Sequence, residues 1–229
     1  MPSEIPRNIV LCYNLQIHTI GWTIMQNHKK GNIYIISAAS GTGKTTLVSR
    51  LLKNHDDIRV SISHTTRQPR EGEAHGVHYH FVPKEEFESL IEQRAFLEHA
   101  NVFGNYYGTS IAGVNSLSEE GYDVILEIDV QGAAQVRKSL PEASSIFILP
   151  PSFEVLAQRL IGRGTDSEEV IQTRLSKARH EIEQSVLFDY VVVNDDLDRA
   201  EADLFHIIKA GRLKKSSQQG FISNLLENS

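Results

Sequence analysis

The chain contains Ile33-Tyr34-Ile35-Ile36, followed by Ser37-Ala38-Ala39-Ser40-Gly41-Thr42-Gly43-Lys44-Thr45-Thr46 and then Leu47-Val48-Ser49-Arg50-Leu51-Leu52. The first segment is apolar and predicts a buried strand, and the last predicts the start of a helix. The two glycines between them let the backbone turn tightly, so that several N–H groups point into one hollow beside the positive end of the helix dipole. A strand, a glycine-rich loop and a helix in this order are typical of a phosphate-binding loop.

The loop follows the P-loop pattern G-x-x-x-x-G-K-[ST], except that Ala38 stands at the first glycine position. In this pattern Lys44 reaches the terminal phosphates of a nucleotide, and the Thr45 hydroxyl ligates Mg²⁺. The alternative is a glycine turn that binds nothing, which the flanking strand and helix disfavour. The residues predicted to surround the phosphates are Ala38, Ala39, Ser40, Gly41, Thr42, Gly43, Lys44, Thr45 and Thr46.

Length and composition limit the class of protein. A chain of 229 residues corresponds to one domain, or to one core domain with inserted lobes. The formal net charge of -6 argues against a general nucleic-acid binder, which is normally basic. Cys12 is the single cysteine, which suits the cytoplasm, and no stretch has the ~18–20 uninterrupted apolar residues of a membrane span.

Predicted strands alternate with predicted helices, so we expect an α/β protein of the P-loop type with a three-layer core around a parallel sheet. The expected strands lie at 33–36, 59–66, 77–82, 124–130, 145–149 and 190–195, and the expected helices at 47–52, 84–93, 131–140, 152–161, 165–186 and 197–213. We assign 31–60 and 113–213 to the core, 61–112 to an inserted β-rich lobe, about 159–175 to a helical lid, 1–30 to an N-terminal extension and 214–229 to a polar C-terminal tail. Met25 precedes a polar lead-in, and we hypothesise that it is the natural start.

Four arginine sites stand out, of which Arg137, on an ordinary helix face, is taken as a solvated surface residue and the other three could hold phosphate groups. Arg67 and Arg70 bracket a proline turn. Arg159 and Arg163 are spaced i,i+4 and so project from one side of a helix, and Arg174 follows on the next predicted helix. Because the planar guanidinium fork matches phosphate oxygens, each is a candidate phosphate ligand.

These segments together resemble the guanylate kinase family, the ATP-dependent kinases of GMP. Because the matching stretches run in family order from about residue 31 to 213, the resemblance covers nearly the whole chain. They include Ser37–Thr46, Ser63-x-x-Thr66-Arg67-x-Pro69-Arg70-x-Gly72-Glu73, His78-Tyr79-x-Phe81-Val82, Phe96-Leu97-Glu98, Gly104-Asn105-Tyr106-Tyr107-Gly108-Thr109, Ile128-Asp129-Val130-Gln131-Gly132, Ile148–Ser152, Arg159–Gly164 and Arg174-Leu175.

The resemblance implies a role for each matching residue. It implies a lobe that binds GMP, with a phosphate clamp made of Arg67, Arg70, Tyr79 and Tyr107 and guanine-reading residues Ser63, Glu98 and Thr109. It also implies that Lys44, Arg67, Arg159, Arg163 and Arg174 act on the transferred phosphate, and that Glu127 and Asp129 lie near the nucleotide and the metal. Glu127 stands where many members carry aspartate, which leaves its contact open.

The chemistry of the bases agrees with this assignment. Guanine presents an N1–H and an N2 amine side by side, and one carboxylate such as Glu98 can accept from both. Adenine offers no such pair, and a site built on polar pairing can reject the wrong base by ~10⁴-fold. The alternative for Glu98 is an exposed carboxylate at the end of a strand.

The resemblance therefore predicts transfer of a phosphoryl group from ATP to GMP, and also to dGMP, with Mg²⁺ as cofactor. GMP phosphate is already an anion, so positioning and charge neutralisation suffice without a general base. Two alternatives remain: a guanylate-kinase-like module that binds a partner without catalysis, and a kinase for another nucleoside monophosphate. The partners expected are ATP and GMP, without nucleic acid or membrane, and the sequence leaves the oligomeric state open.

Overall fold

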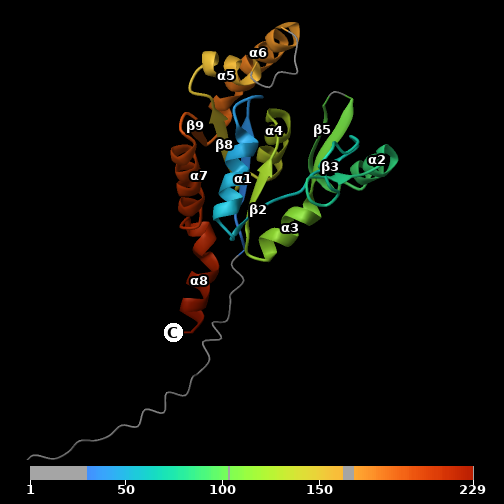
Figure 1. Cartoon of the computed structure of the whole chain (residues 1–229). Helices are drawn as coiled ribbons and strands as arrows, with labels where there is room; N and C mark the ends of the chain where they lie inside the picture. Colours follow the sequence, from blue (N-terminus) through green and yellow to red (C-terminus); the bar gives the residue numbers. More distant parts are fainter. Residues whose placement is uncertain (1–29, 103, 162–167, 229) are drawn as a thin grey trace, which may run out of the picture.

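The computed structural model describes residues 30–102, 104–161 and 168–228. Its central sheet has five parallel strands in the order β2-β7-β1-β8-β9 (Figure 1). Neighbours in this order are rarely consecutive in the chain, so the connections cross over, as a parallel sheet requires. The α/β class with a parallel core is thereby confirmed. The strands are β1 (Ile33–Ala38), β2 (Ile58–Val60), β7 (Asp123–Glu127), β8 (Ser144–Leu149) and β9 (Tyr190–Val193).

Helices cover both faces of this sheet and complete three layers. Side chains along β1 alternate between the faces, as the two-residue period of a strand requires. Tyr34 and Ile36 pack with residues of α1 and α7, whereas Ile35 packs with residues of α3 and α4. The helices are α1 (Lys44–Asn54), α3 (Ile111–Glu119), α4 (Val130–Ser139) and α7 (Leu197–Gly211).

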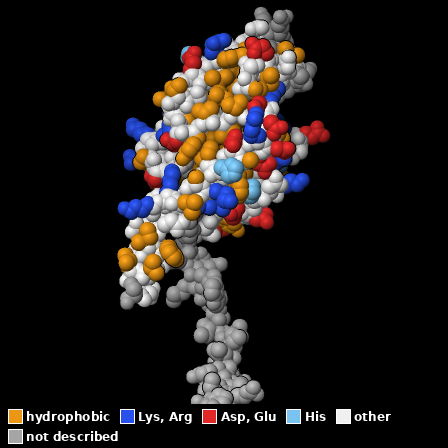
Figure 2. All heavy atoms as spheres, turned by 90° about the vertical axis from the view of Figure 1, so that its left-hand side faces the viewer, with side chains coloured by type: hydrophobic (Ala, Val, Ile, Leu, Met, Phe, Trp, Pro, Cys, Tyr) orange, Lys and Arg blue, Asp and Glu red, His pale blue; other side chains and the backbone are white. Residues whose placement is uncertain are grey.

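Strand β9 corrects one sequence expectation. Residues 190–195 are apolar enough to predict a buried strand, but β9 lies at the edge of the sheet and pairs with β8 alone among the described strands. Val192 is buried, whereas Val191 and Val193 are 48% and 42% exposed. Figure 2 views the molecule from the side of β9 and α7 and shows hydrophobic side chains gathered on that face. An apolar run predicts a strand, but it does not say whether a neighbour covers it.

A second, four-stranded sheet has the order β4-β3-β6-β5 and lies beside the core (Figure 1). Gln135 of α4 links the two parts, because its side chain exchanges hydrogen bonds of 3.2 and 2.9 Å with the backbone of His99 in β5. The strand expected at 77–82 shortens to two residues. The elements are β3 (His64–Thr65), β4 (His80–Phe81), α2 (Lys84–Glu92), β5 (Phe96–Val102) and β6 (Asn105–Ser110).

Two helices follow β8 and lie at the top of Figure 1, namely α5 (Phe153–Ile161) and α6 (Glu168–Glu183). Ser152 caps α5, since its hydroxyl accepts a hydrogen bond of 3.2 Å from the Val155 N–H. The sequence between them includes Gly162-Arg163-Gly164, where a glycine-flanked joint between the two helices is expected, and these residues lie outside the described residues. The lid assigned to 159–175 therefore stays a prediction.

The C-terminal segment is more regular than expected from its polar composition. A short 3₁₀ turn, η1 (Gln184–Leu187), precedes β9, and a final helix, α8 (Lys215–Glu227), occupies most of the predicted tail. Its apolar residues Phe221, Ile222, Leu225 and Leu226 fall at helical spacing, a signal that the polar composition of the segment obscures. No described helix is both long and apolar enough to span a bilayer.

Candidate active site

The glycine-rich loop forms the turn that its sequence predicts. Gly41 and Gly43 have φ angles of +89° and +94°, a region that favours glycine. At Gly43 a Cβ atom would lie 2.7 Å from Nδ2 of Asn194, so this position also has no room for a side chain. Helix α1 begins at the next residue, Lys44, and its first N–H groups therefore lie at the loop.

Two side chains form hydrogen bonds with the backbone of the glycine-rich loop. Arg159 Nη1 and Asn194 Nδ2 both donate to the carbonyl oxygen of Thr42, at 3.0 and 2.8 Å. Arg159 Nη2 also donates to the carbonyl of Asn194 at 3.1 Å. Arg159 thus contacts the backbone of the loop and of the segment after β9, and its predicted role on the transferred phosphate stays a prediction.

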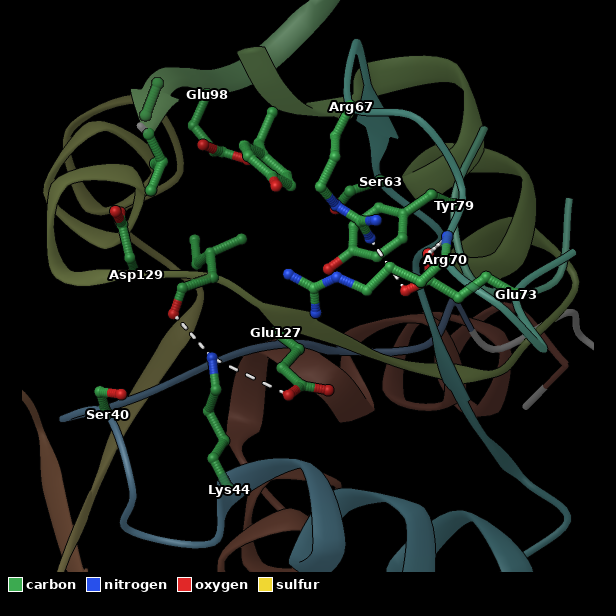
Figure 3. A pocket seen from close by; sticks show the side chains of 14 residues that line it. Ser40, Lys44, Ser63, Arg67, Arg70, Glu73, Tyr79, Glu98, Glu127 and Asp129 are labelled. Atoms are coloured by element: carbon green, nitrogen blue, oxygen red, sulfur yellow. Dashed lines mark hydrogen bonds and ion pairs between the residues drawn. The ribbon is translucent and has the colours of Figure 1, made fainter. Parts of the chain in front are cut away.

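Lys44 reaches across the loop toward the ends of β7 and α4 (Figure 3). Its Nζ donates to the carbonyl of Ile128 at 3.2 Å and lies 3.9 Å from Oε1 of Glu127. Burial lowers the pKa of Lys44, while the nearby carboxylate of Glu127 opposes that shift. The lysine is therefore held in place by the end of the sheet, where ligands of parallel α/β proteins bind.

Thr45 and Glu127 offer oxygen atoms that suit Mg²⁺. The Thr45 hydroxyl donates to Oε1 of Glu127 at 2.7 Å. Mg²⁺ commonly takes one or two protein ligands and completes its shell with water and phosphate oxygens. Among the described residues no three His, Cys, Asp or Glu side chains gather as a metal site. Thr45 therefore fits its predicted role.

A cavity of about 470 Å³ lies between the loop and the second sheet. The loop contributes Ser40 and Lys44 to its wall. The other lining residues come from both sheets and their connections, and they are Ser63, Arg67, Arg70, Glu73, Tyr79, Glu98, Ala100, Val102, Tyr107, Glu127, Ile128 and Asp129 (Figure 3). All four residues of the predicted phosphate clamp thus meet in one place, although they are spread over 41 positions of sequence, from 67 to 107.

The clamp is built around Arg67. Its guanidinium donates to Glu73 at 2.9 Å and lies 5.5 Å from the ring of Tyr79. A hydrogen bond with Tyr107 also acts on Arg67 and contributes to raising its pKa, for which the Glu73 hydrogen bond is the largest cause. The Arg70 backbone N–H donates to the second Glu73 oxygen at 2.7 Å. The guanidinium groups of Arg67 and Arg70 and the hydroxyls of Tyr79 and Tyr107 therefore line one part of the cavity, where a phosphate could bind.

Glu98 lies at the opposite wall of the cavity and is 5% exposed. The Thr109 hydroxyl donates to Oε1 of Glu98 at 2.6 Å, and the Ser63 hydroxyl lies 3.4 Å from that of Thr109. Burial raises the pKa of Glu98, and the hydrogen bond from Thr109 partly offsets that shift. The three residues predicted to read the base are therefore contiguous, and Glu98 is not the exposed carboxylate that the alternative reading requires.

Helix α4 closes this side of the cavity. Asp129 caps the helix, because its Oδ1 accepts from the N–H groups of Gln131 and Gly132 at 3.0 and 2.9 Å. A Cβ atom at Gly132 would lie 2.6 Å from Oε2 of Glu98, so the glycine makes room for the carboxylate. Asp129 therefore has a structural contact in addition to its predicted place near the nucleotide.

Two residues near the cavity had no predicted role. Glu73 belongs to the motif around Arg67, but the motif alone does not say what the carboxylate contacts. Glu181 of α6 accepts a hydrogen bond of 3.2 Å from the Ser40 N–H in the loop. Its position on a helix distant in sequence gives no signal that it reaches the loop. Arg174 lies on α6, and Arg163 lies outside the described residues.

A glycine-rich loop at the carboxyl ends of a parallel sheet, which faces Arg67 and Arg70 of the β3–β4 connection across one cavity, is typical of P-loop phosphotransferases. A family model described as guanylate kinase matches residues 30–211, and the chain belongs to the guanylate kinase family.

Individual relatives agree with that assignment. A guanylate kinase of Neisseria gonorrhoeae is 78% identical over 205 residues, which cover 90% of this chain and 100% of the relative. One of Mannheimia succiniciproducens is 55% identical over 204 residues, 86% of this chain and 98% of the relative. The crystal structure of guanylate kinase from Anaplasma phagocytophilum is 34% identical and superposes with a TM-score of 0.67, over 82% of this chain and 89% of that one.

Proposed function

We propose that this chain transfers the γ-phosphoryl group of ATP to GMP and yields ADP and GDP. The observation that carries the proposal is that one cavity joins both halves of this reaction. Ser40 and Lys44 line its loop end, while Arg67 and Glu98 line its lobe end. The family membership of the chain supports the same reaction.

We assign the acceptor nucleotide to the lobe end. The phosphate of GMP would bind the guanidinium groups of Arg67 and Arg70 and the hydroxyls of Tyr79 and Tyr107, because bidentate and charge-assisted hydrogen bonds suit its oxygens. The ionised carboxylate of Glu98 would accept the N1–H and N2–H groups of guanine. The hydroxyls of Ser63 and Thr109 would complete the contacts to the base. Because the contacts assigned here go to the base and the phosphate, and none goes to the 2′-hydroxyl of the sugar, we predict that dGMP is also accepted.

We assign ATP to the loop end. Residues 38–46 would surround its phosphates, with N–H groups at the start of α1 donating to them, and Lys44 would stabilise the charge that develops on the leaving oxygen. A GMP phosphate oxygen would attack the γ-phosphorus in line while ADP leaves, so no protein group needs to remove a proton. Mg²⁺, held by Thr45, would neutralise phosphate charge, and Arg159, Arg163 and Arg174 would add positive charge at the transferred group.

The test is a turnover assay on the full chain with ATP, Mg²⁺ and GMP, in which equal amounts of ADP and GDP should appear. A panel of AMP, CMP and UMP tests the acceptor, and omission of Mg²⁺ tests the cofactor. Absence of GDP would refute the proposed function, and equal rates with AMP would refute the assignment of Glu98. For location, we propose the cytoplasm, where ATP and GMP both occur.

A further inference from the structure

Glu73 occupies an unexpected place for a carboxylate. It lines the same cavity as the two clamp arginines, and its side chain is 19% exposed. The phosphate of GMP carries negative charge, so the carboxylate of Glu73 repels it. This repulsion weakens GMP binding unless Glu73 also makes a contact that favours binding. The proposed function did not assign any role to this residue.

The contacts of Glu73 show what that effect is. One carboxylate oxygen accepts from Nη2 of Arg67 at 2.9 Å, and the other accepts from the backbone N–H of Arg70 at 2.7 Å (Figure 3). The backbone N–H of Glu73 in turn donates to the Arg70 carbonyl at 3.0 Å, which closes a turn through Gly72 at φ +82°. A single carboxylate thus ties the side chain of one arginine to the backbone of the other.

Arg67 has further contacts besides the one with Glu73. Its Nη1 donates to the Gln68 carbonyl at 2.7 Å, and the rings of Tyr79 and Phe81 lie 5.5 and 5.8 Å from the guanidinium carbon. Because an arginine side chain has many rotamers, fixing one of them before the ligand arrives lowers the entropy lost on binding.

We propose that Glu73 is a positioning residue of the phosphate clamp: it fixes Arg67 relative to Arg70 so that both meet the GMP phosphate without rearrangement. This inference rests on the proposed binding of GMP at the lobe end. The hydrogen bond from Arg67 and that from the Arg70 backbone lower the pKa of Glu73 to about 2, so the carboxylate stays ionised at any pH of assay.

Substitution by glutamine separates positioning from charge, because the two effects have opposite signs. If Glu73 acted through its charge alone, Glu73→Gln would remove a repulsion and tighten GMP binding. If it positions the arginines, the same change weakens GMP binding, since the amide nitrogen of glutamine cannot accept the N–H that one carboxylate oxygen accepts now.

The experiment measures steady-state kinetics and calorimetric GMP binding for wild type, Glu73→Gln, Glu73→Ala and Glu73→Asp. We expect KM and Kd for GMP to rise about 10-fold in Glu73→Gln and further in Glu73→Ala, with KM for ATP changed less than about twofold, because one and then two charge-assisted contacts are lost. Glu73→Asp keeps the charge and shortens the reach, so its KM for GMP should also rise.

Glu71 provides the matched control, because it is exposed in the same turn. Glu71→Gln makes the same change of charge two residues away and should leave KM for GMP within about twofold of wild type. An unchanged or lower KM for GMP in Glu73→Gln, with wild-type melting temperature, would overturn the inference and leave the proposed function intact. If Glu73→Gln does not fold, Glu73→Asp decides alone. A wild-type chain that neither binds GMP nor turns it over would refute both proposals.

Discussion

The two ends of the cavity are built in different ways. At the loop end, nine consecutive residues, 38–46, form the predicted site, and we expect most of its contacts with phosphate to come from backbone N–H groups at the start of α1. At the lobe end, side chains come from separate segments, and each needs a partner to hold it. Arg67 depends on Glu73, and Glu98 depends on Thr109 and on the space at Gly132.

This difference determines how each end should respond to mutation. A backbone site tolerates most side-chain changes, apart from its glycines and its lysine. A side-chain site is sensitive at every contact and at the residues behind the contacts, because a displacement of about 1 Å can cost ~10²-fold in rate. The loop end should therefore control the rate of the chemical step, and the lobe end should control affinity and choice of base.

The largest effect is expected for Lys44→Ala. Removal of the cation should lower kcat by at least about 10³-fold, because an electrostatic contact with the transferred phosphate contributes mainly in the transition state. Calorimetry should give a Kd for GMP within about threefold of wild type, since the lysine lies at the other end of the cavity. Lys53→Ala, an exposed change in the last turn of α1, serves as control. Parallel loss of GMP affinity would show that the two ends are not separable.

The second effect is expected for Glu98→Gln. The amide nitrogen cannot accept from guanine, so kcat/KM for GMP should fall about 10²-fold and the preference for GMP over AMP should shrink by at least as much. Glu92→Gln on the exposed end of α2 is the control. A retained preference for guanine would mean that another group reads the base.

The wild-type pH profile tests the same residue. Burial raises the pKa of Glu98, so its carboxylate takes up a proton at a higher pH than an exposed one does. The protonated acid cannot accept from both guanine donors. KM for GMP should therefore rise as the pH falls, and this rise should begin at a pH above the ordinary pKa of a carboxyl group. The Glu98→Gln variant should not show the rise.

The sequence predicted the loop end well because its information is local. Gly41, Gly43 and Lys44 lie within four residues, and the flanking strand and helix give the orientation. The lobe end could be assembled only through the family resemblance, because no spacing rule brings Arg67, Glu98 and Tyr107 together. The chain folds these segments into one sheet through β3, β5 and β6, and that pairing depends on contacts between distant strands.

Other features could not be predicted for reasons of packing. Val191 and Val193 are as apolar as the buried strand residues, and only the edge position of β9 exposes them. The contact between Glu181 and the Ser40 N–H depends on how α6 crosses the loop. The carboxylate of Asp129 accepts the hydrogen bonds that cap α4, and the family resemblance places the same carboxylate near the nucleotide. The sequence pattern alone does not distinguish a helix cap from a ligand contact.

A smaller effect is expected for Gly132→Ala, which acts on the lobe end from behind. The new methyl group would lie 2.6 Å from Oε2 of Glu98, and the flexible carboxylate should move away from it. KM for GMP should rise about 5–10-fold, because the displacement is only partial. Alanine favours a helix over glycine by ~1 kcal/mol, so the melting temperature should not fall.

Gly113→Ala is a matched control for this prediction. Gly113 is the third residue of α3, as Gly132 is the third residue of α4, and its new methyl group would meet the Ser110 hydroxyl that caps the helix instead of Glu98. This variant should keep KM for GMP within about twofold of wild type. Equal kinetic effects in both variants would mean that helix geometry, and not the position of Glu98, accounts for the change.

The smallest effect concerns the stability of the lobe at mildly acidic pH. The rings of His64 and His80 lie 4.6 Å apart, and His75 lies 5.5 Å from His80. Burial, with repulsion from His80 and His75, lowers the pKa of His64 to about 4 from its ordinary 6.5. The unfolded chain therefore binds this proton more readily than the folded one, so the stabilisation is complete above pH 6.5 and is lost as the pH falls toward 4.

Calorimetric melting of wild type between pH 7 and 5.5 should show a decrease of about 2–4 °C from this group, because His64 is partly exposed to solvent. In His64→Phe the ring contacts with His80 and Phe96 are kept and the titration is removed, so the decrease should be smaller. His180→Gln, at a side chain 85% exposed on α6, should melt with the slope of wild type. If His64→Phe shows that slope too, the lobe owes none of its acid sensitivity to this histidine, and the carboxylates of the cavity become the groups to test.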